Sequence, residues 1–174
     1  MAHVTHRIHL AAPDAQLLDL LLPDFEARAW KLEYVGPPEA YVQDLEKHAR
    51  QGRLSANHID PTWFRRYFCP LLLEVDCADQ ASMEILRNIK LLYGALPVII
   101  VGTNVDWTAL AVARLDGADA LFRRDDLRPG PLTEAVRDAL ARVNRWCGLI
   151  AQFLDTSVRQ VGWPPTVGYN GRVL

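Results

Sequence analysis

The chain has 174 residues, of which 50% are hydrophobic and 23% are charged, and its formal net charge at pH 7 is −2. This length suffices for one domain with a sizeable core, and the composition excludes a disordered chain. The small net charge gives no bulk attraction to nucleic acid or anionic lipid. The N-terminus lacks the pattern of a secretion signal, and no apolar run is long enough to cross a bilayer. We therefore expect a cytoplasmic protein that does not contact membranes.

Cysteine and histidine give no sign of a metal centre. The three cysteines are scattered among apolar residues: Cys69, Cys77 and Cys147. Their odd number and unpaired spacing favour reduced thiols, with no disulfide framework and no catalytic motif. His3, His6 and His9 recur at every third residue, but alternation along a strand places His6 on the opposite face from the other two. We expect no metal and no cofactor.

The first fifty residues predict two strands and two helices in alternation. The strands are expected over residues 7–10 and 30–35, and the helices over residues 16–22 and 39–49. Asp14 can cap the first helix, and Pro23 is expected to end it because proline cannot continue the hydrogen-bond ladder.

Residues 50–70 are long for a connection between a helix and a strand, and loops of this length tend to carry function or structure of their own. Aromatic residues recur at helical spacing over 63–68, with Arg65 and Arg66 between them. A short helix that covers the sheet edge or contacts a partner is one interpretation. Binding of single-stranded nucleic acid is another, with only two arginines to support it.

The central stretch predicts a strand, a crossover helix and a second strand. Apolar runs over residues 71–75 and 97–101 enclose an amphipathic segment, which is the pattern of buried parallel strands. A further helix is expected over 106–115 and a short strand over 120–123.

The final predicted helix is opened by Gly130 and Pro131, with proline at its first position. Its apolar residues alternate at spacings of four and three, as in a heptad repeat: Leu132, Val136, Ala139, Val143, Trp146, Ile150 and Phe153. We expect residues 132–143 to pack in the core. A dimer seam through Val143, Trp146, Ile150 and Phe153 is expected beyond the domain, with packing of the whole helix on its own domain as the alternative. Residues 166–174 are expected to form a tail.

This order of elements is that of an α/β fold with a doubly wound, five-stranded parallel sheet. At this point the sequence resembles the receiver domain of response regulators. The segment LLLEVDCADQASMEILRNIK resembles the third strand and helix of that family, LPVIIVGT the fourth strand, and GADALFRR the fifth. The resemblance implies the strand order 2-1-3-4-5. It also implies a domain over residues 1–145 with an insertion at 50–70, followed by a helical extension over 146–174.

In that family an aspartate accepts a phosphoryl group beside two acidic residues that hold Mg²⁺, a hydroxyl residue and a lysine. The resemblance places these functions at residues that lack the required groups: Ala11 and Ala12 for the acidic pair, Glu74 for the aspartate, Gly102 for the hydroxyl and Arg124 for the lysine. Two alanines leave a hard cation almost no ligands. The resemblance therefore implies a pseudo-receiver that keeps the fold without phosphotransfer, in which Glu74 and Arg124 form a fixed ion pair. A shifted register with Asp76 as acceptor is the alternative.

The first functional hypothesis is an atypical, non-enzymatic module of two-component signalling that acts by protein contact and forms a homodimer. By resemblance, its partner face is expected on one helix, at Trp107, Leu110, Ala111 and Arg114. The second hypothesis is a sensor that binds a small anionic ligand in the vacated pocket, where Gly102 leaves room and Arg123 and Arg124 attract the anion. DNA binding by this chain alone is not favoured, because nothing after Val143 resembles a helix-turn-helix.

Overall fold

The computed structural model describes residues 6–50, 54–55, 58–59 and 68–161, and the side chains of 6–50, 68–150 and 152. The chain forms two compact units, Met1–Val143 and Asn144–Leu174. The helices in the described part of the chain are either too short or too polar to span a membrane.

A single five-stranded sheet organises the first unit. Its strands are β1 (His6–Ala11), β2 (Trp30–Gly36), β5 (Leu71–Asp76), β6 (Val98–Thr103) and β7 (Ala120–Arg123). They lie in the order β2-β1-β5-β6-β7, and every neighbouring pair is parallel. The predicted fold class and strand order are confirmed.

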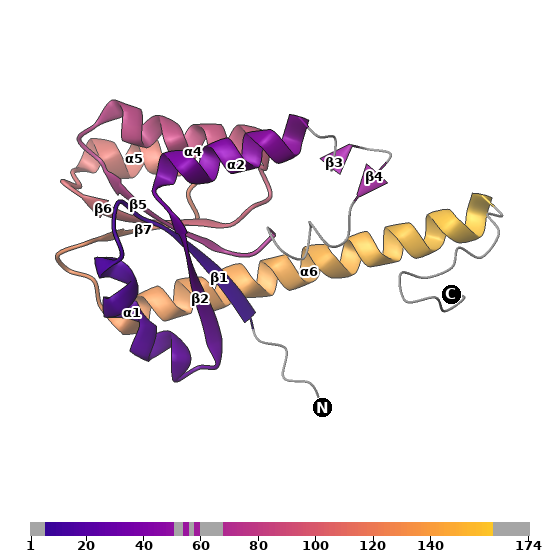
Figure 1. The fold of residues 1–174 in the computed structure, drawn as a ribbon, viewed down its shortest axis with the longest axis horizontal. Helices are drawn as coiled ribbons and strands as arrows, with labels where there is room; N and C mark the ends of the chain where they lie inside the picture. The colour runs from indigo at the N-terminus through magenta and orange to yellow at the C-terminus, as the bar shows by residue number, and fades with distance from the viewer. Residues whose placement is uncertain (1–5, 51–53, 56–57, 60–67, 162–174) are drawn as a thin grey trace. The chain divides into compact units, whose positions relative to one another are not determined.

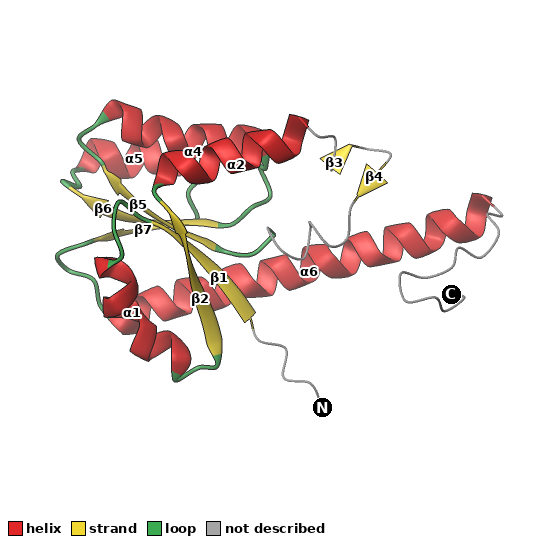
Figure 2. Ribbon diagram, in the orientation of Figure 1, coloured by secondary structure: helices red, strands yellow, loops and turns green. Residues whose placement is uncertain are grey.

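Helices cover both faces of this sheet (Figures 1 and 2). One face carries α2 (Pro38–Arg50), α4 (Gln80–Leu92) and α5 (Trp107–Leu115), and the other carries α1 (Gln16–Glu26) and the first turns of α6 (Pro129–Val161). Parallel strands need such crossovers, which bury both faces. Leu71 and Leu73 pack into the cluster under α2 and α4, and Leu72 packs into the cluster under α1 and α6.

The first helix is longer than predicted. Pro23 lies inside α1, which continues to Glu26. Proline removes one hydrogen bond from the ladder, but the extra turn buries Phe25 completely, with its ring edge-on to Trp30 at a centroid distance of 5.6 Å. This burial offsets the cost of the lost bond. Asp14 Oδ1 accepts a hydrogen bond from the Gln16 backbone N–H at 2.8 Å, but the N-cap position is occupied by Ala15, so Asp14 is not the cap that was predicted.

The last helix begins at Pro129, two residues before the predicted start, and runs without a break to Val161. Leu132, Val136 and Ala139 are fully buried, which confirms their predicted place in the core. Val143 is also buried, at 7% exposure.

The insertion contains two short strands that were not predicted. β3 (Leu54–Ser55) and β4 (His58–Ile59) pair antiparallel, separate from the main sheet. The helix expected over 63–68 lies outside the described residues except for Phe68, and so does the tail expected over 166–174.

Candidate functional site

The five positions that correspond to the receiver pocket lie at the carboxyl ends of four neighbouring strands. Ala11 ends β1 and Ala12 follows it, Glu74 lies in β5, Gly102 lies in β6, and Arg124 follows β7. Open parallel sheets bind their ligands at this edge. The fold therefore brings residues together that are up to 113 positions apart in the sequence, from Ala11 to Arg124.

An ion pair joins Glu74 to Arg124. Arg124 Nε lies 3.4 Å from Glu74 Oε1, and their side chains are 19% and 12% exposed. The backbone N–H of Arg124 donates to the Gly102 carbonyl oxygen at 2.8 Å, which fixes the chain where β7 ends. The pair expected from the sequence is thus present, and it links the end of β7 to β5.

The Glu74 carboxyl is held in an environment that disfavours its charge. Burial raises its pKa, the Arg124 charge opposes this shift, and the Asp14 charge adds to it. Arg124 Nη1 is buried and has no hydrogen-bond partner among the described residues. The pair is therefore partly desolvated, and such pairs fix geometry more than they add stability.

Neighbouring side chains fill the space beside Gly102. A Cβ at this position would lie 2.5 Å from Cys77 Sγ and 2.7 Å from Val105 Cγ2. The expectation that Gly102 leaves room for a ligand is wrong, because the loops after β5 and β6 fold Cys77 and Val105 over it. The same contacts leave no room for the hydroxyl residue of a receiver.

The two alanines give a cation nothing to bind. Ala11 and Ala12 are fully buried, and the backbone of Ala12 is engaged on both sides. Its N–H donates to the Gly36 carbonyl at 3.1 Å, and its carbonyl accepts from the Tyr34 hydroxyl at 3.0 Å. Among the described residues, no three His, Cys, Asp or Glu side chains gather in a way that could hold a metal ion.

Asp76, the alternative acceptor, has a different role at the same sheet edge. It is exposed, and its Oδ1 accepts from Asn104 Nδ2 and from the Ala78 backbone N–H, both at 3.0 Å. Asn104 adopts a left-handed backbone with φ of 50°. The carboxylate that meets Arg124 belongs to Glu74, so the register that matches Glu74 to the acceptor position agrees with this geometry.

The predicted dimer seam divides between the two units. Val143 is buried and belongs to the first unit, whereas Trp146 belongs to the second. Trp146 is 45% exposed, Leu149 is 57% exposed, and Ile150 is partly buried. The side chain of Phe153 lies outside the description.

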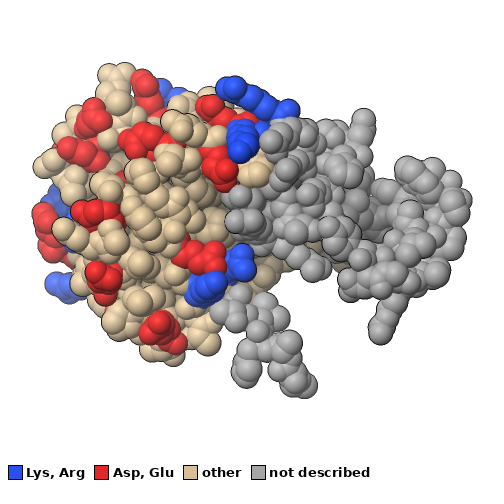
Figure 3. Space-filling model, viewed as in Figure 1, with Lys and Arg blue, Asp and Glu red and all other residues tan. Residues whose placement is uncertain are grey.

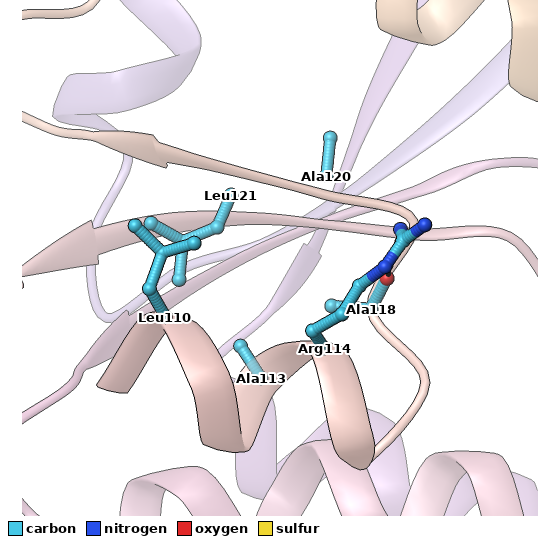
Figure 4. Close-up of a pocket in the computed structure, with 6 residues that line it drawn as sticks. All are labelled: Leu110, Ala113, Arg114, Ala118, Ala120 and Leu121. Atoms are coloured by element: carbon cyan, nitrogen blue, oxygen red, sulfur yellow. Dashed lines mark hydrogen bonds between the residues drawn. The ribbon is translucent and has the colours of Figure 1, made fainter. Parts of the chain in front are cut away.

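The predicted partner face on α5 is exposed, with Trp107 at 87% and Leu110 at 44%. Ala111 and Arg114 are exposed as well. Beside this face lies a shallow groove of about 340 Å³ between α5 and the β7 segment (Figure 4). It is lined by Leu110, Ala113, Arg114, Ala118, Ala120 and Leu121.

Sequence reasoning found only two of these six lining residues, Leu110 and Arg114. The alanines carry no chemical signal, and Leu121 was predicted only as part of a short strand. The sequence feature that pointed to this surface was the apolar character of α5. On the face of the first unit that Figure 1 also shows, acidic side chains are scattered and basic ones lie mainly at the edges (Figure 3).

No family model and no curated protein matches the sequence. Solved structures do match. A CheY-like response regulator receiver domain protein from Methanospirillum hungatei JF-1 superposes with a TM-score of 0.59 at 18% identity, covering 81% of this chain and 98% of its own. The signal receiver domain of a LuxO repressor protein from Vibrio parahaemolyticus gives 0.61 at 14% identity, covering 84% and 98%.

A third similar structure is a fusion that contains a trimeric coiled coil of yeast Spc42. Its TM-score is 0.58 at 13% identity, and the match covers 94% of this chain and 100% of that one. Identities this low establish the architecture alone. The chain has the fold of response regulator receiver domains.

Proposed function

We propose that this chain is a receiver-like signalling module that is not phosphorylated and that acts through protein contacts. The observation that carries the proposal is the ion pair of Glu74 with Arg124 at the strand-end pocket. Phosphoryl transfer to a carboxylate needs a positioned nucleophile and a cation that neutralises the developing charge. Here the carboxylate is engaged by a guanidinium, and the alanines offer a cation no oxygen side chain.

The fixed pair supports a module with one conformation at this edge rather than a switch. In this proposal, Arg124 holds the segment after β7 against β5 permanently, and binding partners recognise that single state. Cys77 and Val105 occupy the space beside Gly102. This close packing is what we expect of a pocket that binds no substrate.

The test is incubation of the full chain with acetyl phosphate and Mg²⁺, followed by intact mass measurement. We expect no mass increase. A gain of one phosphoryl group that disappears in Asp76→Asn would establish Asp76 as an acceptor and refute the proposal, and a gain that disappears in Glu74→Gln would refute it as well. An active receiver domain treated in parallel verifies the reagent.

We further propose that the chain forms a homodimer through α6 beyond Asn144. The supporting observations are the exposed apolar side chains of Trp146 and Leu149 and the heptad spacing that continues to Phe153. Apolar residues at alternating spacings of three and four pack between two helices. The coiled-coil fusion among the similar structures agrees with a helix of this kind.

Light scattering coupled to size exclusion tests the dimer on the full chain and on Ile150→Glu/Phe153→Glu. The full chain is expected to have the mass of a dimer and the double variant that of a monomer. Leu91→Glu, at a leucine of α4 that is 78% exposed, is the matched control and is expected to remain a dimer. An unchanged mass in the double variant would contradict the seam.

A small anionic ligand at the strand-end pocket is the second candidate function. The one observation in its favour is Arg124 Nη1, which is buried without a hydrogen-bond partner among the described residues. A ligand that binds only the folded chain raises its midpoint of thermal unfolding. A panel of phosphate, nucleotides and dicarboxylates tests this, and a rise that Arg124→Met abolishes would favour the sensor over the contact module.

A further inference from the structure

The strand β2 forms one border of the five-stranded sheet (Figure 2). In the order β2-β1-β5-β6-β7, the strand β1 is the neighbour with which β2 pairs. Part of the backbone N–H and C=O groups of β2 point away from β1, toward a side on which the described part of the chain places no strand. A border of this kind is a template for pairing with another strand unless charges, proline or a cover protect it.

The part of β2 that can pair is short and well defined. Ala29, just before the strand, has a φ of 56°, and Gly36, its last residue, has a φ of 98°. Both values lie outside the extended conformation, and Pro37 follows with no N–H to donate. Residues 30–35 are therefore the extended run at this border. The run contains no proline, so its hydrogen-bond ladder can continue into a neighbour.

The two faces of this border differ in character. Trp30 and Leu32 pack into the cluster under α1, and Val35 packs into the cluster on the side of α2. Alternation along the strand places Lys31 and Glu33 on the side of Val35. Lys31 Nζ lies 2.6 Å from Glu33 Oε1, and the Lys31 side chain is 55% exposed. One face is thus apolar, and the other carries one charge of each sign.

The sequence of the run is symmetric in size and antisymmetric in charge. It has an aromatic residue at each end, a leucine at the centre, and a basic and an acidic residue between them: Trp30, Lys31, Leu32, Glu33 and Tyr34. A two-fold axis that relates two copies of one border makes the two strands antiparallel. Opposed residues share a face, and faces alternate along a strand, so this axis passes through a residue and not between two residues.

One register of such a pair opposes the unlike charges. With the axis at Leu32, Lys31 of each copy lies opposite Glu33 of the other, and Trp30 lies opposite Tyr34. An axis at Lys31 or at Glu33 would instead oppose two identical charges. Opposite charges and aromatic residues that face each other stabilise an antiparallel pair, and like charges destabilise it. The charges that would block other pairings therefore favour this one.

We propose that two copies of this chain pair through their β2 borders, antiparallel and centred on Leu32, so that one sheet continues across both copies. This interface is separate from the proposed seam on α6 and goes beyond the proposed function. Two strands this short bury much less area than a standard interface, so the contact is expected to be weak and to form at high concentration. Where the α6 dimer also forms, the β2 contact joins dimers into larger assemblies.

The opposite border of the sheet is a poorer match for β2. The strand β7 (Ala120–Arg123) has four residues and none of them is acidic, so it offers no charge to Lys31. Pairing of β2 with β7 of another copy would also join two different borders. Such a contact has no two-fold closure and would grow without limit.

Sedimentation equilibrium over a concentration series from about 10 μM to about 1 mM tests the proposal. The full-length Ile150→Glu/Phe153→Glu chain is used as the background, so that the α6 seam does not contribute and the two interfaces are tested separately. We expect a monomer at low concentration and a dimer at high concentration. Lys31→Glu and Glu33→Lys, each added to this background, are expected to weaken association about tenfold or more, because each opposes two pairs of like charges.

A mixture of the two single variants is the decisive measurement. In a mixed dimer every acidic side chain again lies opposite a basic one. Equal amounts of Lys31→Glu and Glu33→Lys are therefore expected to associate as strongly as the background chain. The double variant Lys31→Glu/Glu33→Lys exchanges the two charges and is expected to self-associate in the same way. Either recovery also shows that the variants are folded, because unfolded chains would not pair in register.

Matched controls are Arg137→Glu on α6 and Glu84→Lys on α4, which make the same charge changes at exposed positions outside β2. They are expected to leave the association unchanged. A chain that stays monomeric over the whole series, single variants that associate as well as the background, or a mixture without recovery would overturn the proposal. A mass that keeps growing with concentration would indicate pairing of β2 with β7 and would overturn it as well.

Discussion

Asp119 Oδ2 accepts a hydrogen bond from the backbone N–H of Val98 at 2.6 Å, which ties the turn before β7 to the first residue of β6. The same carboxylate pairs with Lys90 Nζ at 3.5 Å and with Arg142 Nη1. One side chain thus joins α4, β6 and α6 at the amino-terminal edge of the sheet. Burial lowers the pKa of Lys90, and the Asp119 charge opposes that shift.

Asp119→Ala is expected to destabilise the chain by about 2–4 kcal/mol, because a buried donor and a mostly buried ammonium lose their partner. Urea unfolding measures the change. The control is Asp116→Ala, which removes an ion pair to the exposed Arg87 and is expected to cost much less, because exposed ion pairs add little stability. Equal losses in both variants would show that Asp119 is no more important than a surface pair.

Gly102→Ala is expected to destabilise the fold by about 1–3 kcal/mol, because the added Cβ overlaps Cys77 Sγ and Val105 Cγ2. Cys77→Ala removes the closer of these contacts. In the Cys77→Ala background, the cost of Gly102→Ala is therefore expected to shrink, and a double-mutant cycle by urea unfolding measures the coupling. Strict additivity would mean that the two side chains do not compete for this space.

Glu74 predicts a particular dependence of stability on pH. Burial raises its pKa in the folded chain above the ordinary value of 4.5, so the folded state binds the proton more tightly than the unfolded state. Its contribution to stability is complete below the unfolded pKa and is lost as pH rises through the folded pKa. Relative to Glu74→Gln, the unsubstituted chain should gain stability as pH falls through that window.

Urea unfolding of both chains at a series of pH values around and above 4.5 measures this difference. The opposite slope, with the unsubstituted chain losing stability relative to Glu74→Gln on acidification, would mean that Arg124 lowers the pKa of Glu74 more than burial raises it.

The thiols are expected to differ in reactivity. Burial raises the pKa of Cys69 to about 12, and the Glu33 charge adds to the shift, so almost no thiolate forms at neutral pH. Burial also raises the pKa of Cys77, but this residue is only partly buried. Iodoacetamide is therefore expected to label Cys77 before Cys69, as followed by peptide mass. In urea the difference should vanish, and equally fast labelling of the two thiols in the folded chain would contradict the burial of Cys69.

The sequence was most informative where hydrophobic periodicity and turn residues agree. The strand predicted over residues 120–123 matches β7 in both bounds, and the helix predicted over 106–115 differs from α5 only by its cap, Asp106. Boundaries set by proline were less well predicted. Pro23 does not end α1, because the turn beyond it buries Phe25, and α6 begins at Pro129 rather than at Pro131.

The candidate site was predictable in part. The spacing of Glu74 and Arg124 in the receiver-like segments predicted the ion pair, since both lie at strand ends that the fold aligns. The closure over Gly102 was not predictable, because it depends on how the loop that carries Cys77 folds back. The groove beside β7 arises from residues whose sequence signal is weak on its own, and it exists only when α5 lies against β7.

The continuity of α6 has a consequence for how its second half comes to be helical. In water, a helix must first form a nucleus whose cost isolated segments shorter than about 12–15 residues rarely overcome. The turns around Leu132 and Val136 form this nucleus inside the core, so each later residue only extends an existing ladder. The turns around Trp146 and Ile150 therefore continue a helix whose first turns are held in the core. A protein that binds those turns contacts a helix that is already formed. Binding therefore does not carry the entropy cost of ordering this helix.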